Sequence, residues 1–463
     1  MIKQASSFAE IVLRIVPSRL STTERESFER QNSSSDSPKR SYDVLIYTEL
    51  AIAELPRSTS PPSGQRQTIA GLPFVGRERI TVHWTSYQSY YAAFVEGEKA
   101  FRHMRERLLE TMSPGLSAIF GNPPQTNKPL RLWLSSETPE LDDLPWELIA
   151  SDRRNFDSAT FSLVRGLPPE IPTPIVPVGE RLRLALIHQP IFTPSYLRYP
   201  FNLVPPEIEI TEFTESPRKA LEQVVREGYE LVHIVADGVV SRAYEGILYF
   251  HGFHSENSSQ SYSYQQQPDS PQLSPNELST LLGNSRVSVL CLTEQDYSNP
   301  DLVEIAGREV PSVYRAFAYL GGSPLLLPSI VAPLGPLKEE QGRRFWSEFY
   351  RQLTETFNLS QAVKHAREMP NHSSLPVALF LRHLQNVLFR RETAEKRQSE
   401  VDPVHLGASL QLSNELVTQL KAHADLYGDS SEGISLFLEN EEKRQAVMSE
   451  QLEPWLKSEE ETL

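Results

Sequence analysis

The sequence predicts an α/β protein with a mostly parallel central sheet that carries helices on both faces. Two observations predict this class. Four short apolar runs have the length and composition of buried strands: residues 181–187, 231–236, 287–292 and 324–331. Helical patterns lie between them, at residues 217–228, 276–283 and 311–320. Strands that alternate with helices along a chain form parallel sheets, because each crossover helix returns the chain to the same starting edge.

Composition restricts the class of protein further. The chain has 463 residues, of which 39% are hydrophobic and 23% are charged, as is usual for globular proteins. Its formal net charge of −15 argues against general binding to nucleic acid or to an anionic membrane, since both favour a basic surface. The single cysteine, Cys291, excludes intrachain disulfides and cysteine-rich metal sites.

The chain also lacks the sequence signals of membrane insertion and export. It contains no run of about 18 apolar residues, the length needed to span a bilayer. Its first residues, MIKQASSFAEIVLRIV, lack the basic start, the long apolar stretch and the cleavage site of a secretory signal. We therefore expect a cytoplasmic protein that does not enter a membrane.

Residues 1–84 are interpreted as a β-hairpin region with disordered inserts. Residues 8–16 and 42–47 have the alternation, or the β-branched and aromatic content, of two strands. Residues 17–40 between them are rich in Ser, Glu and Arg, and residues 56–72 are rich in Pro, Ser and Gln. Both segments are therefore predicted to be loops or disordered.

A second domain is predicted over residues 85–389. It begins with a helical pattern at 87–112 and a strand at 129–135, ahead of the four buried runs. After these runs, large apolar side chains recur at helical spacing, and we interpret this stripe as core packing. The stripe consists of Phe345, Trp346, Phe349, Tyr350, Leu353 and Phe357. Ser360 is predicted to cap the helix that follows.

A polar segment at residues 251–274 interrupts this domain and is predicted to be a loop insertion. It contains His251 and His254, whose spacing is compatible with two metal ligands. No cysteine or acidic cluster completes such a site, so we expect no metal. The chain also has no nucleotide-binding or HExxH motif, so we expect no cofactor.

Residues 390–402 have the charge density of a solvated linker, and a separate unit is predicted over residues 403–463. Residues 404–412 alternate as a strand, and two helical patterns follow it. This order resembles a ribbon-helix-helix unit, which pairs its strand with that of a second copy. The resemblance implies a homodimer through residues 404–445.

Charge decides what this C-terminal unit is expected to bind. Ribbon-helix-helix proteins read DNA with the paired strands, and Ser409 and Gln411 would occupy the reading positions. However, residues 401–463 hold four basic residues against thirteen acidic ones, a net charge of −9. Phosphate contacts require Lys and Arg, so dimerisation or docking of a protein partner is favoured over DNA binding.

Seven segments of the larger domain, in this order, resemble the CHAT domain family. They are LPWEL at 144–148, VRG at 164–166, ELVHIVADG at 230–238, LSPNELSTLL at 273–282, SVLCLTEQ at 288–295, AYLGGSPLLLPSIV at 318–331, and FWSEFYRQL with LSQAVKHARE, ending at 368. PVALFLR at 376–382 fits the family's closing strand. The resemblance covers about residues 85–385 and implies the caspase-like fold of this family of cysteine peptidases.

The family's catalytic residues lie on the loops after residues 231–236 and 287–292. In active members a histidine on the first loop is the general base, and a cysteine on the second is the nucleophile. Here Asp237 stands at the histidine position and Thr293 at the cysteine position. A threonine hydroxyl is a much weaker acid than a thiol, and a carboxylate with a reference pKa of about 3.9 is a poor base at pH 7.

The resemblance therefore implies a catalytically inactive pseudoprotease. It would serve as a scaffold, or as a regulatory or peptide-binding subunit, in a bacterial defence or signalling assembly. Two other functions stay open. His233 and Cys291 lie close to the two loops and could form the displaced dyad of an active cysteine endopeptidase, although buried cysteines are usually inert. The C-terminal unit could instead make the chain a DNA-binding regulator.

A structural pairing is also predicted near the start of the larger domain. Glu147 in LPWEL and Arg165 in VRG carry opposite charges, and we expect them to pair and hold a strand edge.

Overall fold

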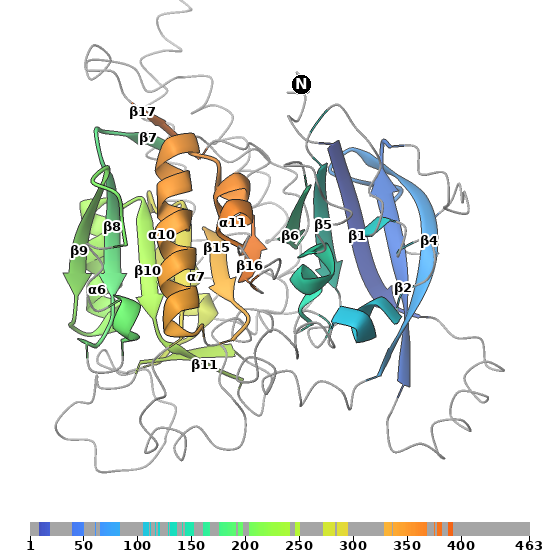
Figure 1. The fold of residues 1–463 in the computed structure, drawn as a ribbon, viewed down its shortest axis with the longest axis horizontal. Coiled ribbons are helices and arrows are strands. Elements are labelled where there is room, and N and C mark those ends of the chain that lie inside the picture. Colours follow the sequence, from blue (N-terminus) through green and yellow to red (C-terminus); the bar gives the residue numbers. More distant parts are fainter. Residues whose placement is uncertain are drawn as a thin grey trace, which may run out of the picture. The chain divides into compact units, whose positions relative to one another are not determined.

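Twelve strands form one large sheet in the part of the chain that the structure describes (Figure 1). The computed structural model describes residues 9–18, 39–50, 61, 65–83, 105–110, 112, 116, 119–120, 128, 130–136, 141, 144–151, 161–166, 176–190, 193–197, 203–240, 246–250, 272–282, 285–294, 328–335, 337–367, 375, 377–381 and 388–391. The strand order is β3-β4-β2-β1-β5-β6-β16-β15-β14-β10-β8-β9.

The strands of this sheet are β1 (Ala9–Pro17), β2 (Lys39–Thr48), β3 (Thr68–Ile69), β4 (Leu72–His83), β5 (Leu130–Ser136), β6 (Phe161–Arg165), β8 (Leu182–Ile187), β9 (Ile208–Phe213), β10 (Leu231–Val235), β14 (Val289–Thr293), β15 (Ser329–Pro333) and β16 (Val377–Phe380). Two small sheets accompany it. One contains β11 (Asp237–Val240), β12 (Gly246–Tyr249) and β13 (Gln272–Leu273), and the other contains β7 (Val176–Val178) and β17 (Phe389–Arg391). The helical elements are η2 (Trp146–Ser151), η4 (Ser195–Leu197), α6 (Pro217–Glu227), α7 (Pro275–Leu282), α10 (Glu339–Thr356) and α11 (Leu359–Arg367).

The predicted parallel sheet is confirmed. Strands β9, β8, β10, β14 and β15 are parallel neighbours, and four of them coincide with the four apolar runs. Strand β9 was not predicted, because its sequence IEITEF places charged residues among the apolar ones. Strand β16 then pairs antiparallel with β15 and in parallel with β6.

Helices cover both faces of the parallel strands, as predicted. Helices α6 and α7 pack on one face, where Leu221 and Leu278 join a core with Ile234 and Leu292. Helices α10 and α11 pack on the other face, where Phe349 joins a second core with Cys291. The alternation of side chains along each strand produces the two cores, since successive residues point to opposite faces.

The N-terminal strands extend the same sheet. Strands β1 and β2 form the predicted antiparallel hairpin, and β1 also pairs in parallel with β5. The prediction of a loop over residues 56–72 is wrong at its end, because Thr68–Ile69 form β3 and β4 begins at Leu72. The turn between them contains Ala70 and Gly71 at φ 49° and 82°, the left-handed pair that suits a two-residue hairpin turn.

The start of α11 also differs from the prediction. Helix α11 begins at Leu359, and Ser360 lies inside it. The capping residue is Asn358, whose Oδ1 accepts a hydrogen bond of 3.1 Å from the Gln361 backbone N–H. Asparagine and serine are both common caps, so the sequence alone did not separate the two positions.

The chain divides into two compact units, Met1–Arg390 and Arg391–Leu463. The predicted C-terminal unit at 403–463, the helix at 311–320 and the histidines at 251 and 254 lie outside the described residues. No helix within the described ranges is long and apolar enough to cross a membrane.

Candidate functional site

Two neighbouring parallel strands bring the predicted positions to one edge of the sheet. In the pairing of β10 with β14, His233 lies opposite Cys291, and Val235 lies opposite Thr293. The Ala236 backbone N–H donates a 3.0 Å hydrogen bond to the Thr293 carbonyl, so the pairing continues one residue past β10. Loops at the carboxyl ends of parallel strands are where open α/β sheets place their functional groups.

A buried hydrogen-bond chain joins these strands to α10. His233 Nε2 lies 2.8 Å from the Thr293 hydroxyl, and His233 Nδ1 lies 2.7 Å from the Tyr350 hydroxyl. Tyr350 is also hydrogen-bonded to the Cys291 thiol. Each of the four groups has one proton to donate and an atom that accepts, so the chain Thr293–His233–Tyr350–Cys291 is satisfied in either direction.

Helix α10 places Tyr350 through the aromatic stripe that the sequence predicts to be core. The ring centroid of Trp346 lies 4.4 Å from that of His233. Phe345 and Phe349 stack at 6.2 Å with an interplanar angle of 6°. All four aromatic side chains are fully buried, which confirms that the stripe packs in the core and fixes Tyr350 above the two strands.

Burial controls the charge of this chain. Removal from water lowers the pKa of His233 to about 3, and nearby His188 acts in the same direction. Burial raises the pKa of the Cys291 thiol far above its usual range, and the hydrogen bond with Tyr350 opposes this only in part. Burial likewise raises the pKa of Tyr350, and Cys291 adds to that effect. All three shifts favour the neutral forms of these groups at neutral pH.

Asp237 lies two residues after the end of β10 in the sequence. Its side chain is buried, and it is the first residue of β11, where it pairs in register with Tyr249. The hydroxyl of Thr293 is hydrogen-bonded to His233, which lies four residues before Asp237 in the sequence. Glu294, the next residue after Thr293, is also buried.

A second polar group at the same edge was missed by the sequence analysis. His188 follows β8 directly, and its Nε2 lies 3.0 Å from a carboxylate oxygen of Glu212 on β9. Its Nδ1 lies 2.9 Å from the Thr193 hydroxyl, which itself donates to the Gln189 carbonyl at 2.6 Å. Burial lowers the pKa of His188, while the hydrogen bond with Glu212 opposes that shift. The signal that could have found it is a polar residue placed directly after a buried strand.

The predicted pairing of Glu147 with Arg165 is confirmed. Arg165 Nε and Nη2 donate to the two carboxylate oxygens of Glu147 at 2.8 Å and 2.7 Å, and both side chains are buried. Arg165 Nη2 also donates to the Leu144 carbonyl at 2.6 Å. The pair therefore ties the LPWEL segment to the end of β6.

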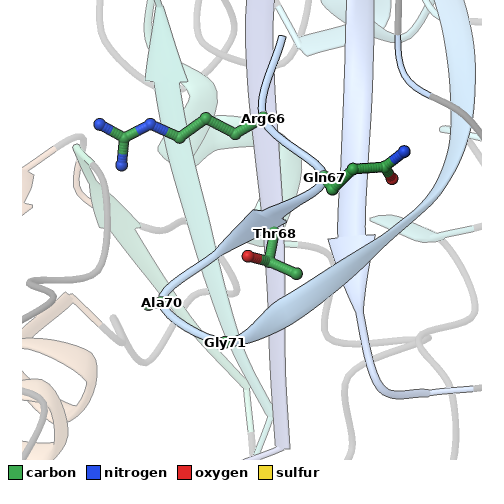
Figure 2. Close-up of a pocket in the computed structure, with 5 residues that line it drawn as sticks. All are labelled: Arg66, Gln67, Thr68, Ala70 and Gly71. Carbon is green, nitrogen blue, oxygen red and sulfur yellow. The ribbon is translucent and has the colours of Figure 1, made fainter.

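A surface pocket lies at the opposite end of the sheet, on the β3–β4 hairpin. It has a volume of about 520 Å³ and is lined by Arg66, Gln67, Thr68, Ala70 and Gly71 (Figure 2). These residues belong to the N-terminal strands, so the pocket is separate from the hydrogen-bond chain. Across the described ranges, no group of three or more His, Cys, Asp or Glu side chains is arranged to hold a metal ion.

The parallel strands and the helices on both faces define an α/β domain, and the polar chain lies on two of its central strands. Residues 202–383 match the family model of the CHAT domain, and this segment is a CHAT domain, a caspase-like domain. The match includes the positions of both predicted catalytic loops. No curated protein matches the chain.

Proposed function

We propose that this protein is a CHAT-domain pseudoprotease that acts as a scaffold, or as a regulatory or peptide-binding subunit. The observation that carries the proposal is the 2.8 Å contact between the Thr293 hydroxyl and His233 Nε2. Active members of the family have a cysteine at this position. Here the position holds a hydroxyl that is bound within the core, at 2% exposure of the residue.

The chemistry of the surrounding groups supports the absence of cysteine catalysis. A cysteine peptidase requires a thiolate, which forms because a neighbouring imidazolium lowers the thiol pKa. Threonine has no comparable acidity, and the lowered pKa of His233, about 3, makes its imidazole a weak base at neutral pH. The bound hydroxyl thus lacks a partner able to remove its proton.

The displaced dyad of His233 and Cys291 is the alternative activity. The two residues lie opposite one another in the pairing of β10 with β14, but Cys291 has 0% exposure and a raised thiol pKa. A buried neutral thiol cannot reach a peptide bond in solution. A thiol-directed electrophile tests this alternative: it should label Cys291 only after denaturation, and labelling of the native protein would favour the dyad.

Cleavage assays test the main proposal. Purified protein should leave a diverse peptide library intact at neutral pH. A second library incubated with the Thr293→Ala/Asp237→Ala variant controls for contaminating peptidases. If the native protein cleaves peptides and the variant does not, the proposal is wrong.

Partners of this protein are proposed on the charge and the predicted C-terminal unit. We expect a protein or peptide partner and a homodimer formed through residues 404–445, which lie outside the described part of the chain. The DNA-binding alternative predicts a shifted band in a gel assay over genomic fragments at low salt. Absence of any shifted fragment at micromolar protein would remove it, since low salt favours every phosphate contact.

A further inference from the structure

Helix α11 is hydrogen-bonded at both ends to strands of the N-terminal half of the sheet, defined here as β1 to β6. At its C-terminal end, Arg367 Nη1 donates to the Leu163 carbonyl of β6 at 3.2 Å. At its N-terminal end, the Ser360 hydroxyl accepts a 3.4 Å hydrogen bond from Arg131 Nη2 of β5. The helix therefore contacts strands that lie outside the segment matching the CHAT family.

The same arginine also holds the C-terminal half of the sheet. Arg367 Nε donates to the Val377 carbonyl of β16 at 2.7 Å. The guanidinium thus joins carbonyls from two neighbouring strands, β16 and β6. Among the described residues, these strands share one registered pair, Phe380 with Arg165, whereas β10 and β14 share five. The arginine provides hydrogen bonds where the strand pairing is short.

Burial of this guanidinium costs desolvation free energy, which its hydrogen bonds must offset. Arg367 is 7% exposed, and burial lowers its pKa to about 10, with Glu147 opposing the shift and Arg165 adding to it. Its Nη2 has no hydrogen-bond partner in the described part of the chain. An apolar side chain of similar length would avoid the desolvation cost but could not bind the two carbonyls. We therefore attribute the presence of an arginine at position 367 to these two hydrogen bonds.

Helix α11 also connects this junction to the buried hydrogen-bond chain. Helices α10 and α11 pack in one core that includes Phe349, Leu353 and Val363. Only a short turn separates them, and Phe357 at its centre adopts φ 53° while its N–H donates to the Leu353 carbonyl at 2.8 Å. Figure 1 shows the two helices side by side over the parallel strands. Arg367 therefore lies on a helix that packs against the helix of Tyr350.

We propose that Arg367 is a clasp that couples the N-terminal half of the sheet to the CHAT domain. With the clasp in place, the two halves unfold as one unit. Without it, β6 separates from β16 and the two halves open independently. The clasp operates whether or not the site cleaves peptides, so it stands apart from the proposed function.

Hydrogen exchange on the full-length protein tests the clasp. Arg367→Met removes both carbonyl hydrogen bonds and retains an apolar side chain. Amide exchange in β6 and β16 should become about ten-fold to one hundred-fold faster, because each lost bond to a buried carbonyl is worth about one factor of ten or more. Exchange in β10 and β14 should change far less, and thermal unfolding should split into two transitions.

Arg351→Met is the matched control. Arg351 lies on α10, is exposed, and pairs with Glu348 and Glu355 of its own helix at 2.6 Å and 2.5 Å. This variant should exchange like the native protein. The clasp would be overturned if amide exchange in the Arg367→Met variant became faster by the same factor in every strand. It would also be overturned if exchange in β6 and β16 did not become faster. If Arg367→Met does not fold, Arg367→Lys decides, since lysine cannot serve both carbonyls in the same geometry and should give the local acceleration in weaker form.

Discussion

Threonine at position 293 provides a hydrogen-bond partner for His233. The hydroxyl, the imidazole, the Tyr350 phenol and the Cys291 thiol form one buried chain. Buried polar groups that are fully satisfied rigidify a core, whereas a group left without a partner destabilises it. The site therefore contributes to stability and to the position of α10, and each member can be tested by a single substitution.

Tyr350→Phe should destabilise the protein. The change removes the hydroxyl that contacts both His233 Nδ1 and Cys291, and leaves the imidazole nitrogen buried without that partner. The expected loss is about 1–3 kcal/mol in the free energy of unfolding. Urea denaturation measures it. Tyr229→Phe is the control, since the Tyr229 hydroxyl bonds Thr211 at the edge of the sheet, and its loss should be smaller. Equal losses would contradict the role of Tyr350.

The lowered pKa of His233 predicts a pH dependence of stability. In the unfolded chain this histidine takes up a proton below about pH 6.5, whereas the folded protein keeps it neutral down to about pH 3. The unfolded state then binds more protons, so stability falls as the pH is lowered from about 6.5 towards 3, by up to about 1.4 kcal/mol per pH unit. Between pH 7 and 9 this contribution is constant.

His233→Asn isolates this contribution, because the groups around it, Thr293, Tyr350 and His188, remain. The free energy of unfolding of both proteins is measured by urea denaturation at each pH from 7 to 4. The native protein should lose more stability than the variant across this range. Parallel curves would mean that His233 is protonated in the folded state.

The sequence located part of this site and could not locate the rest. The loops after two apolar runs, with the family resemblance, predicted positions 237 and 293, and Thr293 is hydrogen-bonded to His233. Tyr350 could not be assigned, because it lies 117 residues from His233 and was indistinguishable from the other aromatic residues of its helix. His188 was also missed, because its partner Glu212 lies on β9, a strand that the apolar pattern does not predict.

At the scale of elements, α10 shows which features a periodic pattern predicts. The spacing of its aromatic residues predicts the helix and the face that is buried, and both are confirmed. A contact near the start of the helix that is distant in sequence could not be predicted. Gly342 lies in the first turn and is buried against the ring of Tyr196 in η4, so a Cβ at this position would overlap the ring.

Gly342→Ala should therefore destabilise the protein, although alanine is the better helix former. In an open helix the substitution would stabilise by about 1 kcal/mol. Here the ring of Tyr196 has to move within a packed core, and such overpacking costs about 1–3 kcal/mol. Thermal unfolding measures the sign. Arg344→Ala, at an exposed position of the same helix, is the control and should leave stability nearly unchanged. A stabilised Gly342→Ala protein would contradict the close packing of η4 on α10.

At the scale of the whole molecule, the parallel strands were predicted and the extent of the sheet was not. Buried strands appear as apolar runs because both of their faces are covered. Strands β4 and β9 at the margins of the sheet alternate with charged residues, and their pairing depends on neighbours that are distant in sequence. Strand β1 pairs with β5, and β6 pairs with β16, so both halves form one sheet. These pairings are tertiary contacts, and no local sequence pattern predicts them.

The last prediction concerns assembly: the protein is expected to be a homodimer held mainly by residues 404–445. A ribbon-helix-helix protomer of about 40 residues is too small to bury a stable core by itself. Its strand has an unpaired edge, which pairs with a second copy in antiparallel register. Apolar residues would form the shared core: Leu406, Leu410, Leu416, Leu420, Ile434 and Phe437. Deletion of residues 400–463 falls within the second compact unit, Arg391–Leu463, and should leave a folded monomer whose α/β part keeps its thermal transition. Light scattering at tens of micromolar protein decides between the arrangements, because a monomeric full-length protein or a dimeric truncation would exclude this interface.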